Sequence, residues 1–386
     1  MFSARTRWDR TTNQLSTLVA SRHAQGARVF DLTETNPTRV ALPRPADLLR
    51  PLSDPAGLSY EPDPQGLKAA REAVCADWAR RGVALVPERV FLTASTSEAY
   101  AFLFKLLCDS RDEVLVPHPS YPLFEYLAGL ESVGARPYPL VYLDGWHVER
   151  AALEQAIGPR TRAVVVVSPN NPTGSFLKKD EAEWLHELAA ARGLAIVSDE
   201  VFADYPWRPD ADRAQSMAAD GPALAFTLGG LSKSCGLPQL KLAWLTVSGP
   251  LRLREEALGR LEVIADTYLS VSTPVQLLAP TLLARAPELR APIAARVAAN
   301  RRVLQERLAR GAPASLLRGE GGWSAVLRIP ATMPEEQRVV ALLAEHDVLV
   351  HPGYFFDFAH EAHLVLSLLP AEDDFAQAVD RIVRVL

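Results

Sequence analysis

Cysteine is scarce in this chain of 386 residues, which contains only three. Cys75, Cys108 and Cys235 lie far apart, form no CxxC pair and have no histidine cluster of metal-ligand spacing beside them. Three scattered cysteines exclude a disulfide framework, and the missing histidine spacing excludes a structural zinc site. We therefore expect a reducing compartment and no bound metal.

Long apolar runs are also missing, because no stretch approaches the roughly 20 residues that a membrane-spanning helix needs. Residues 1–25 lack the apolar core of a secretory signal, although their arginines and hydroxyl residues faintly resemble a transit peptide. We expect no membrane association, and the cytoplasm is the default prediction for the location.

The chain has no large excess of charge of one sign, since the formal net charge is -5 and acidic and basic residues are interspersed. Such a chain has no basic patch for nucleic acid or for an anionic membrane. No GxGxxG motif follows an early predicted strand, which disfavours a nicotinamide-dependent dehydrogenase. Because a single core rarely grows beyond about 250–300 residues, we expect a large domain and a smaller one.

The pattern of apolar residues predicts an α/β large domain whose mainly parallel sheet is sandwiched by helices. Short β-branched runs alternate with longer amphipathic stretches such as residues 96–108 and 178–193. Several runs are apolar throughout, as expected for strands that helices cover on both faces. The predicted strands are residues 89–95, 113–119, 161–169, 194–200, 223–230 and 242–249.

The pattern changes after residue 250. An almost wholly helical stretch to residue 311 precedes predicted strands interleaved with helices, which indicates a smaller α+β domain. Its strands are residues 323–330, 347–353 and 363–370, and its last helix places Phe375, Val379, Ile382 and Leu386 on one face. The predicted units are an N-terminal arm that joins the small domain (1–45), a large domain (46–275) and a small domain (276–386). The proline-spaced residues 36–57 are predicted to form an extended arm and connector.

Unusual residues follow five of the predicted strands, at the edge of an open α/β sheet where ligands bind. Ser95, Thr96 and Ser97 open a helix, whose N-terminus can bind an anion, although an ordinary N-cap would also explain them. Tyr121 follows the second strand on a proline-stiffened turn. Its ring either stacks on a planar ligand or belongs to the core.

The other three strands end in an amide, a carboxylate and an amine. The turn "SPNNPTG" fixes Asn170 and Asn171, which turn chemistry alone would also favour. Asp199 follows an apolar run, where a carboxylate needs a partner; the alternative is a buried structural cap. Lys233 ends the segment "GGLSK", whose small residues let the backbone approach a ligand, and Lys241 follows eight positions later.

One ligand accounts for all five loops together. Pyridoxal phosphate is planar and has a phosphate, a ring nitrogen that needs a carboxylate, a ring oxygen that needs a donor and an aldehyde that needs an amine. Lys233 would supply the amine. Lys241 would neutralise the phosphate and help to keep the Lys233 amine nucleophilic.

The segments "NNPTG", "SDEVFADY" and "LSKSCGLPQLKLAW", in this order and at these separations, resemble the fold-type I, class I/II aminotransferases that use pyridoxal phosphate. The resemblance extends over nearly the whole chain, from "DLTETNPTR" to the last helix. It implies that Lys233 is the Schiff-base lysine, Asp199 the partner of the pyridine nitrogen and Asn171 the donor to the ring oxygen. It also implies that the remaining cofactor residues are Tyr121 as the stacking ring, Ser95, Thr96, Ser97 and Ser232 as the phosphate cup, and Tyr60 reaching the phosphate of the neighbouring subunit. The protein would then be at least a homodimer.

Three positions depart from the pattern of this family. Lys241 stands where the family usually has a phosphate-binding arginine, so the charge is kept but the bidentate fork is lost. Phe202 replaces a tyrosine that bonds the ring oxygen, and losing this donor is expected to raise the pKa of the Schiff base. Val365 stands where the family usually has the arginine that holds the substrate's α-carboxylate, which leaves the holder of that carboxylate open.

Four residues are candidates for the substrate site. Asn36 and Arg39 belong to the segment that passes over the substrate in this family, and Arg39 would supply the missing clamp unless it is a surface arginine. Trp323 and Tyr354, together with His351, would line a pocket for a substrate held differently, unless these rings belong to the core.

We therefore predict a homodimeric aminotransferase that moves an amino group between an amino acid and a 2-oxo acid, with Lys233 carrying the proton from Cα to C4′ of pyridoxal phosphate. A carbon–sulfur β-lyase or a decarboxylase of the same fold would keep every cofactor residue and is the alternative. A regulator with an aminotransferase-like sensing domain is disfavoured because the short N-terminal arm has no room for a winged helix.

Overall fold

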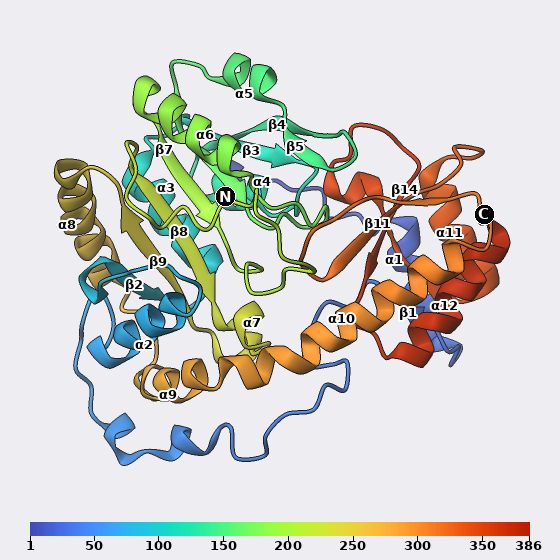
Figure 1. Cartoon of the computed structure of the whole chain (residues 1–386), viewed down its shortest axis with the longest axis horizontal. Helices are drawn as coiled ribbons and strands as arrows, with labels where there is room; N and C mark the ends of the chain where they lie inside the picture. The colour runs from blue at the N-terminus through green and yellow to red at the C-terminus, as the bar shows by residue number, and fades with distance from the viewer.

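The computed structural model describes all 386 residues. Figure 1 shows a large sheet with helices on both sides and, beside it, a smaller group of elements that contains both α1 and α12. None of the helices combines the length and the apolar character that a membrane crossing requires. The helices are α1 (Gln14–Ala24), α2 (Lys68–Ala79), α3 (Thr96–Leu107), α4 (Phe124–Leu130), α5 (Arg150–Ala156), α6 (Lys179–Arg192), α7 (Leu231–Ser234), α8 (Leu251–Tyr268), α9 (Thr273–Ala284), α10 (Ala286–Leu308), α11 (Glu335–His346) and α12 (Glu372–Val385).

The large sheet has eight strands in the order β2-β9-β8-β7-β6-β3-β4-β5. Strands β8, β7, β6, β3 and β4 run parallel to their neighbours in this series, whereas β9 is antiparallel to both β2 and β8, and β5 is antiparallel to β4. The prediction of a mainly parallel sheet is confirmed. Its strands are β2 (Val90–Thr93), β3 (Glu113–His118), β4 (Gly134–Tyr142), β5 (Trp146–Val148), β6 (Thr161–Val167), β7 (Ala195–Asp199), β8 (Ala225–Gly230) and β9 (Ala243–Ser248).

Helices cover both faces of this sheet because its strands are apolar on both sides. Ala163 and Val165 of β6 belong to the cluster with α3, α4 and α8, whereas Val164 and Val166 belong to the cluster with α5 and α6. The side chains of a strand alternate between the two faces, so consecutive buried residues fill two separate cores. The apolar runs in the sequence therefore give this two-sided packing.

Two strands of the large sheet were missed by the sequence prediction. β4 contains Pro137 and Pro139, which argue against a central strand, and β5 has only three residues. Prolines are tolerated here because residues 134–139 pair with β3 alone, whereas residues 140–142 pair with β5.

The smaller group is an α+β unit built on an antiparallel sheet of order β10-β11-β14-β13. Its strands are β10 (Ser315–Leu316), β11 (Ser324–Arg328), β13 (His351–Pro352) and β14 (His363–Ser367), and a separate parallel pair joins β1 (Phe30–Asp31) to β12 (Val348–Leu349). The single strand predicted over 347–353 is therefore wrong, since its two halves pair with different partners. The prediction that residues 36–57 are extended is wrong for most of the segment: residues 37–41 and 46–49 form turns, and Arg50–Ser53 and Pro55–Leu58 form short 3-10 helices, as the many prolines also favour.

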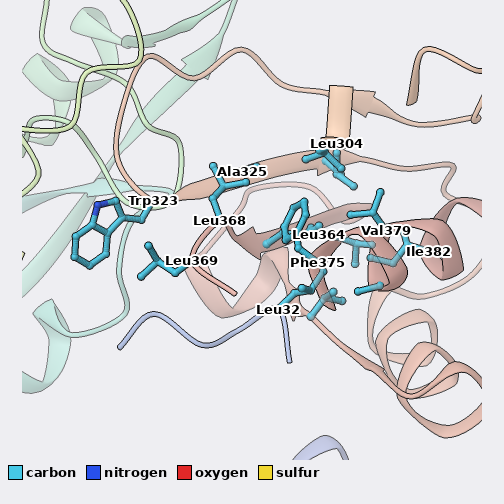
Figure 2. Packing of buried hydrophobic residues seen from close by; sticks show 14 of the residues in the cluster. Leu32, Leu304, Trp323, Ala325, Leu364, Leu368, Leu369, Phe375, Val379 and Ile382 are labelled. Atoms are coloured by element: carbon cyan, nitrogen blue, oxygen red, sulfur yellow. The ribbon is translucent and has the colours of Figure 1, made fainter. Parts of the chain in front are cut away.

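The core of the small unit joins the N-terminal arm to the C-terminal helix. Phe30 and Leu32 of the arm lie in one cluster with Phe375, Val379 and Ile382, the predicted apolar face of α12. Figure 2 shows these α12 side chains directed toward Leu32 and the strand that carries Leu364.

The long helix α10 connects the two units. Its first turn, with Ala286 and Leu289, packs in the cluster of α2 and α9, whereas Ile293, Val297 and Leu304 pack in the small-unit core. Figure 1 shows α10 running from α9 to α12. Helix α10 therefore contributes to the cores of both units.

Replacing Phe375 with alanine tests the small-unit core. The ring is fully buried, so Phe375→Ala should lower the free energy of unfolding by about 3–5 kcal/mol. Urea denaturation followed by circular dichroism measures the change. Gln377→Ala, on the exposed face of the same helix, is the matched control and should change it by less than about 0.5 kcal/mol. Equal denaturation midpoints for the two variants would show that Phe375 is not part of the core.

Candidate active site

The register of the large sheet brings the loops with unusual residues to one edge. Thr93 at the end of β2 and Gly230 at the end of β8 both pair with Ala243, the first residue of β9. On the other side, Asp199 at the end of β7 pairs with Val167 of β6 and with Leu228 of β8. The loops that follow β2, β6, β7 and β8 therefore begin at nearly the same level, as expected at the carboxyl edge of an open sheet.

A cavity of about 190 Å³ lies at this edge. Seven of the residues predicted from the sequence line it: Thr96, Ser97, Tyr121, Asn171, Asp199, Lys233 and Trp323. They come from both units, since Trp323 precedes β11 of the small sheet while the other six belong to the large unit. The cavity therefore lies at the junction of the two units.

Lys233 reaches the cavity from the short helix α7, which follows β8 directly. Its Nζ atom lies 5.2 Å from the ring centre of Phe202 and 5.2 Å from that of Trp323. Burial lowers the pKa of the Lys233 ammonium, and the nearby Asp199 carboxylate opposes this effect. The amine is thus shifted toward its neutral, nucleophilic form.

The main chain of α7 is fixed by two side chains from other elements. The Tyr205 hydroxyl donates to the Lys233 carbonyl at 2.7 Å, and Arg290 Nε of α10 donates to the Ser234 carbonyl at 2.8 Å. The last carbonyls of a helix have no partner within the helix, so these bonds satisfy groups that α7 leaves free. Arg290 is itself paired with Asp77 of α2 at 2.9 Å and with Asp204 at 3.1 Å.

Small residues before Lys233 are needed for a steric reason. A Cβ atom at Gly229 would lie 2.5 Å from Nε1 of Trp244, and one at Gly230 would lie 3.0 Å from Cβ of Ala243. The pair of glycines therefore lets β8 pack against β9 at the point where the chain turns into α7.

Asp199 is a partly buried carboxylate with two donors. Its Oδ1 atom accepts the Val201 N–H at 3.1 Å, and Oδ2 accepts the Tyr100 hydroxyl at 3.2 Å. Burial raises the pKa of Asp199 to about 6, although both hydrogen bonds and Lys233 lower it. A carboxylate in this environment favours a cationic partner that would restore its charge.

The two asparagines of "NNPTG" have different roles. Asn170 is buried and its amide bonds to the Pro119 carbonyl, the Ser120 hydroxyl and Thr173, so it holds the turn together. Asn171 lines the cavity, and its Oδ1 accepts the Ser324 hydroxyl at 3.2 Å. Because the carbonyl oxygen of its amide is bonded to Ser324, the NH₂ group of Asn171 is left to donate to a ligand.

The N-terminus of α3 opens toward the cavity through Thr96 and Ser97. The Ser95 hydroxyl accepts the Glu98 N–H at 3.2 Å, so this side chain serves as the N-cap that was the alternative interpretation. The N–H groups of Thr96 and Ser97 have no acceptor within the chain, and they can bind an anion there.

Several predicted residues lie outside the cavity lining. Ser232 is partly buried, Lys241 is exposed in a left-handed turn with φ of 51°, and Tyr60 is 69% exposed. Asn36 Oδ1 accepts hydrogen bonds from the Thr38 N–H and hydroxyl. The residue of this segment that lines the cavity is Thr35.

The other substrate candidates are also elsewhere. Arg39 is exposed and pairs with Glu34 at 3.2 Å, as in the surface alternative. Tyr354 is half-exposed, and its N–H donates to Glu335. The ring of His351 stacks on Phe355 at 4.8 Å, and burial lowers the pKa of His351 to about 4.

Sequence reasoning missed four polar residues of the cavity, Thr35, Tyr100, Ser120 and Ser324. Tyr100 lies one helical turn after Thr96, so it could have been found from the i, i+4 spacing on α3. Ser324 could not, because its contact with Asn171 joins residues 153 positions apart in the chain. No group of three or more metal-ligating side chains is present.

Comparison with known proteins identifies the family. A model of aminotransferase class I and II matches residues 33–382. An alanine aminotransferase of Mycobacterium tuberculosis is 28% identical over 376 residues, which are 93% of this chain and 86% of that protein. A glutamate-pyruvate aminotransferase of Escherichia coli is 26% identical over 377 residues, covering 94% of this chain and 91% of its own. The solved structure of an alanine aminotransferase from Pyrococcus furiosus covers 100% of this chain and 99% of its own with a TM-score of 0.88 and 22% identity.

The chain therefore belongs to the class I and II aminotransferases, a family that uses pyridoxal phosphate. It is a transaminase, and the family, fold and reaction class predicted from its motifs are confirmed.

The raised pKa of Asp199 predicts how stability depends on pH. Its folded pKa of about 6 is above the ordinary value of 3.8, so the folded state favours the protonated carboxyl and loses stability as pH rises from about 4 to about 6. In the cofactor-free protein, Asp199→Asn should remove this loss and raise the melting temperature at pH 7.5. The gain should shrink as the pH falls from 6 to 4.

Thermal unfolding of both proteins from pH 4 to pH 8 measures the difference. Asn keeps an acceptor for the Val201 N–H, so lost hydrogen bonding should be small. A melting temperature for Asp199→Asn that is lower than that of the unchanged protein at pH 7.5 would contradict the raised pKa.

Proposed function

We propose that this aminotransferase binds pyridoxal phosphate covalently through Lys233 and transfers an amino group between an amino acid and a 2-oxo acid. The observation that carries the proposal is the placement of the Lys233 amine, the Asp199 carboxylate, the Asn171 amide and the α3 N-terminus around one cavity. When bound, this cofactor supplies an aldehyde that reacts with amines and a ring that stabilises negative charge at the substrate Cα.

The side chains that line the cavity provide a chemical partner for each functional group of the cofactor. Thr96 and Ser97 offer hydroxyls and free N–H groups to the phosphate at a helix N-terminus. Asp199 would pair with the protonated ring nitrogen, which would return this carboxyl to its charged form. Asn171 would donate to the ring oxygen, and Tyr121, which is 48% exposed, offers a free face for stacking.

Lys233 has two tasks in the proposed reaction. As a neutral amine it binds the cofactor aldehyde, which the lowered pKa of its side chain supports. When free, the same amine would accept the proton from the substrate Cα and would deliver it to C4′ of the cofactor. Phe202 and Trp323 limit the access of water to Nζ, since both rings lie 5.2 Å from it.

The substrates are proposed to be an amino acid and a 2-oxo acid, supported by the alanine and glutamate-pyruvate aminotransferases among the relatives. We also propose a reducing compartment such as the cytoplasm, supported by three unpaired cysteines. The β-lyase and decarboxylase alternatives differ in their products. A β-lyase releases pyruvate and ammonia and a decarboxylase releases carbon dioxide, whereas only transamination converts a second 2-oxo acid into an amino acid without releasing ammonia.

We further propose that the active enzyme is a homodimer with shared sites. Tyr60 is 69% exposed and lies outside the cavity of its own chain. Such a tyrosine is available to the phosphate of a second copy, as the family resemblance implies.

Two lysine variants test the role of Lys233. Lys233→Ala should abolish turnover, because neither the covalent link nor the proton carrier is left, whereas Lys241→Ala should mainly weaken cofactor retention. Transaminase assays and equilibrium dialysis of the cofactor measure the two effects separately. A Lys233→Ala protein with full activity would refute the proposal.

Hybrid dimers test the shared site. Tyr60→Phe alone should weaken cofactor binding by roughly 10- to 100-fold, the effect of one hydrogen bond to a charged group. A hybrid of one Lys233→Ala subunit and one Tyr60→Phe subunit should regain one cofactor site of unchanged affinity, since the intact Lys233 site receives the intact Tyr60. If Tyr60 serves its own subunit, neither site of the hybrid will bind normally.

A further inference from the structure

The position that carries the family's carboxylate-binding arginine is closed by apolar packing in this chain. Val365 is buried in a cluster with Trp146, Leu317, Val326 and Phe356. It lies on the face of β14 opposite Leu364 and Leu366, which belong to the small-unit core. Val365 therefore faces the large unit, where an arginine would be expected to reach the substrate, but it offers no polar atom.

No other cation replaces this arginine within the chain. Lys233 is the only basic residue that lines the cavity. Arg39, the replacement suggested by the sequence, has a side chain that is 73% exposed and paired with Glu34. The carboxylate of an amino acid must therefore be recognised by a different kind of group.

Trp323, which lines the cavity, has a hydrogen-bond donor without a partner. The residue is 2% exposed, it lines the cavity, and its Nε1 atom has no acceptor in the chain. A buried N–H without an acceptor costs free energy. A ligand that accepts a hydrogen bond from this N–H therefore gains the bond without first having to displace a water molecule. Figure 2 shows the indole at the edge of the small-unit core, with its nitrogen on the side of the ring away from Leu369.

The indole is held rigidly. The Trp323 carbonyl accepts the Leu368 N–H at 2.8 Å, which ties the residue to the end of β14. Its ring meets the rings of Phe202 and Tyr205 edge-on, at centre distances of 5.2 Å and 5.1 Å. A donor fixed in this way loses little conformational entropy when it binds a ligand.

The distance to Lys233 places this donor beside the reacting atoms. Lys233 Nζ lies 5.2 Å from the indole ring centre. In the proposed reaction the substrate amine takes the place of this amine, and a carboxylate carbon lies only about 2.5 Å from its amine nitrogen. A carboxylate oxygen of the substrate can therefore come within hydrogen-bond distance of the indole edge.

We propose that the Trp323 indole N–H binds the carboxylate of the substrate in place of the missing arginine. This inference rests on the proposed function. The indole N–H is a neutral donor, so it can donate to any good hydrogen-bond acceptor and selects less strongly for a negative charge than a guanidinium does. The substrate class is then amino acids together with their primary amides, with apolar side chains that suit the wall of Leu123, Phe124 and Leu127.

Binding of two unreactive probes to the cofactor-loaded protein tests this inference. 3-Phenylpropionate and 3-phenylpropanamide have the same apolar group and no amine, so neither can be turned over. In the unmodified protein, the carboxylate should bind no more than roughly 10-fold more tightly than the amide. This comparison by calorimetry requires no variant, and a preference of 1000-fold or more (about 4.1 kcal/mol) would overturn the proposal.

Two variants then locate the contact. Trp323→Phe keeps the ring packing and removes the N–H, so it should weaken 3-phenylpropionate binding by roughly 10- to 100-fold. Arg39→Gln should change that affinity by less than about 3-fold, as expected for an exposed ion pair. A loss of carboxylate binding in Arg39→Gln, with none in Trp323→Phe, would overturn the proposal and assign the clamp to Arg39.

The absorption spectrum of each protein with pyridoxal phosphate separates this test from that of the proposed function. If the unmodified protein does not take up the cofactor, the proposed function itself fails. If every variant takes it up equally and only the probe affinities disagree with expectation, the role of Trp323 alone is refuted.

Discussion

The structure depends on the removal of one amine and one carboxylate from water in the same cavity. Burial lowers the pKa of Lys233 and raises that of Asp199, so each group is shifted toward its neutral form. The attraction between the two charged forms opposes both pKa shifts. The two side chains nevertheless form no direct ion pair. A planar ligand with a cationic ring nitrogen and a carbonyl carbon would satisfy both groups at once, which is why we propose that these two residues define the cofactor site.

The cavity exists only because two units meet at the carboxyl edge of the large sheet. Trp323 and Ser324 of the small unit close it, and Ser324 also fixes the amide of Asn171 across the junction. Arg290 of α10 ties the main chain after Lys233 to Asp77 of α2. Since α10 packs in both cores, the position of the reactive amine and the relative placement of the two units are set by the same helix.

Much of this architecture could be predicted from the sequence because its signals are local. The apolar runs that became β6 and β7 are buried on both faces. Asp199 is the last residue of β7 and Lys233 lies three residues after the end of β8, so their place at the sheet edge follows from the topology. β4 was missed because its prolines are tolerated only at a position that lacks a second neighbour. The role of Ser324 and the free indole N–H of Trp323 depend on contacts between distant segments, which no local pattern indicates.

The proposed chemistry depends on which lysine carries the reactive amine. Borohydride reduction of the protein loaded with pyridoxal phosphate, followed by proteolysis and mass spectrometry, shows which lysine is attached to the cofactor. We expect one modified site per chain, on the peptide that contains Lys233. Modification of Lys241 or of another lysine, with Lys233 left free, would contradict it.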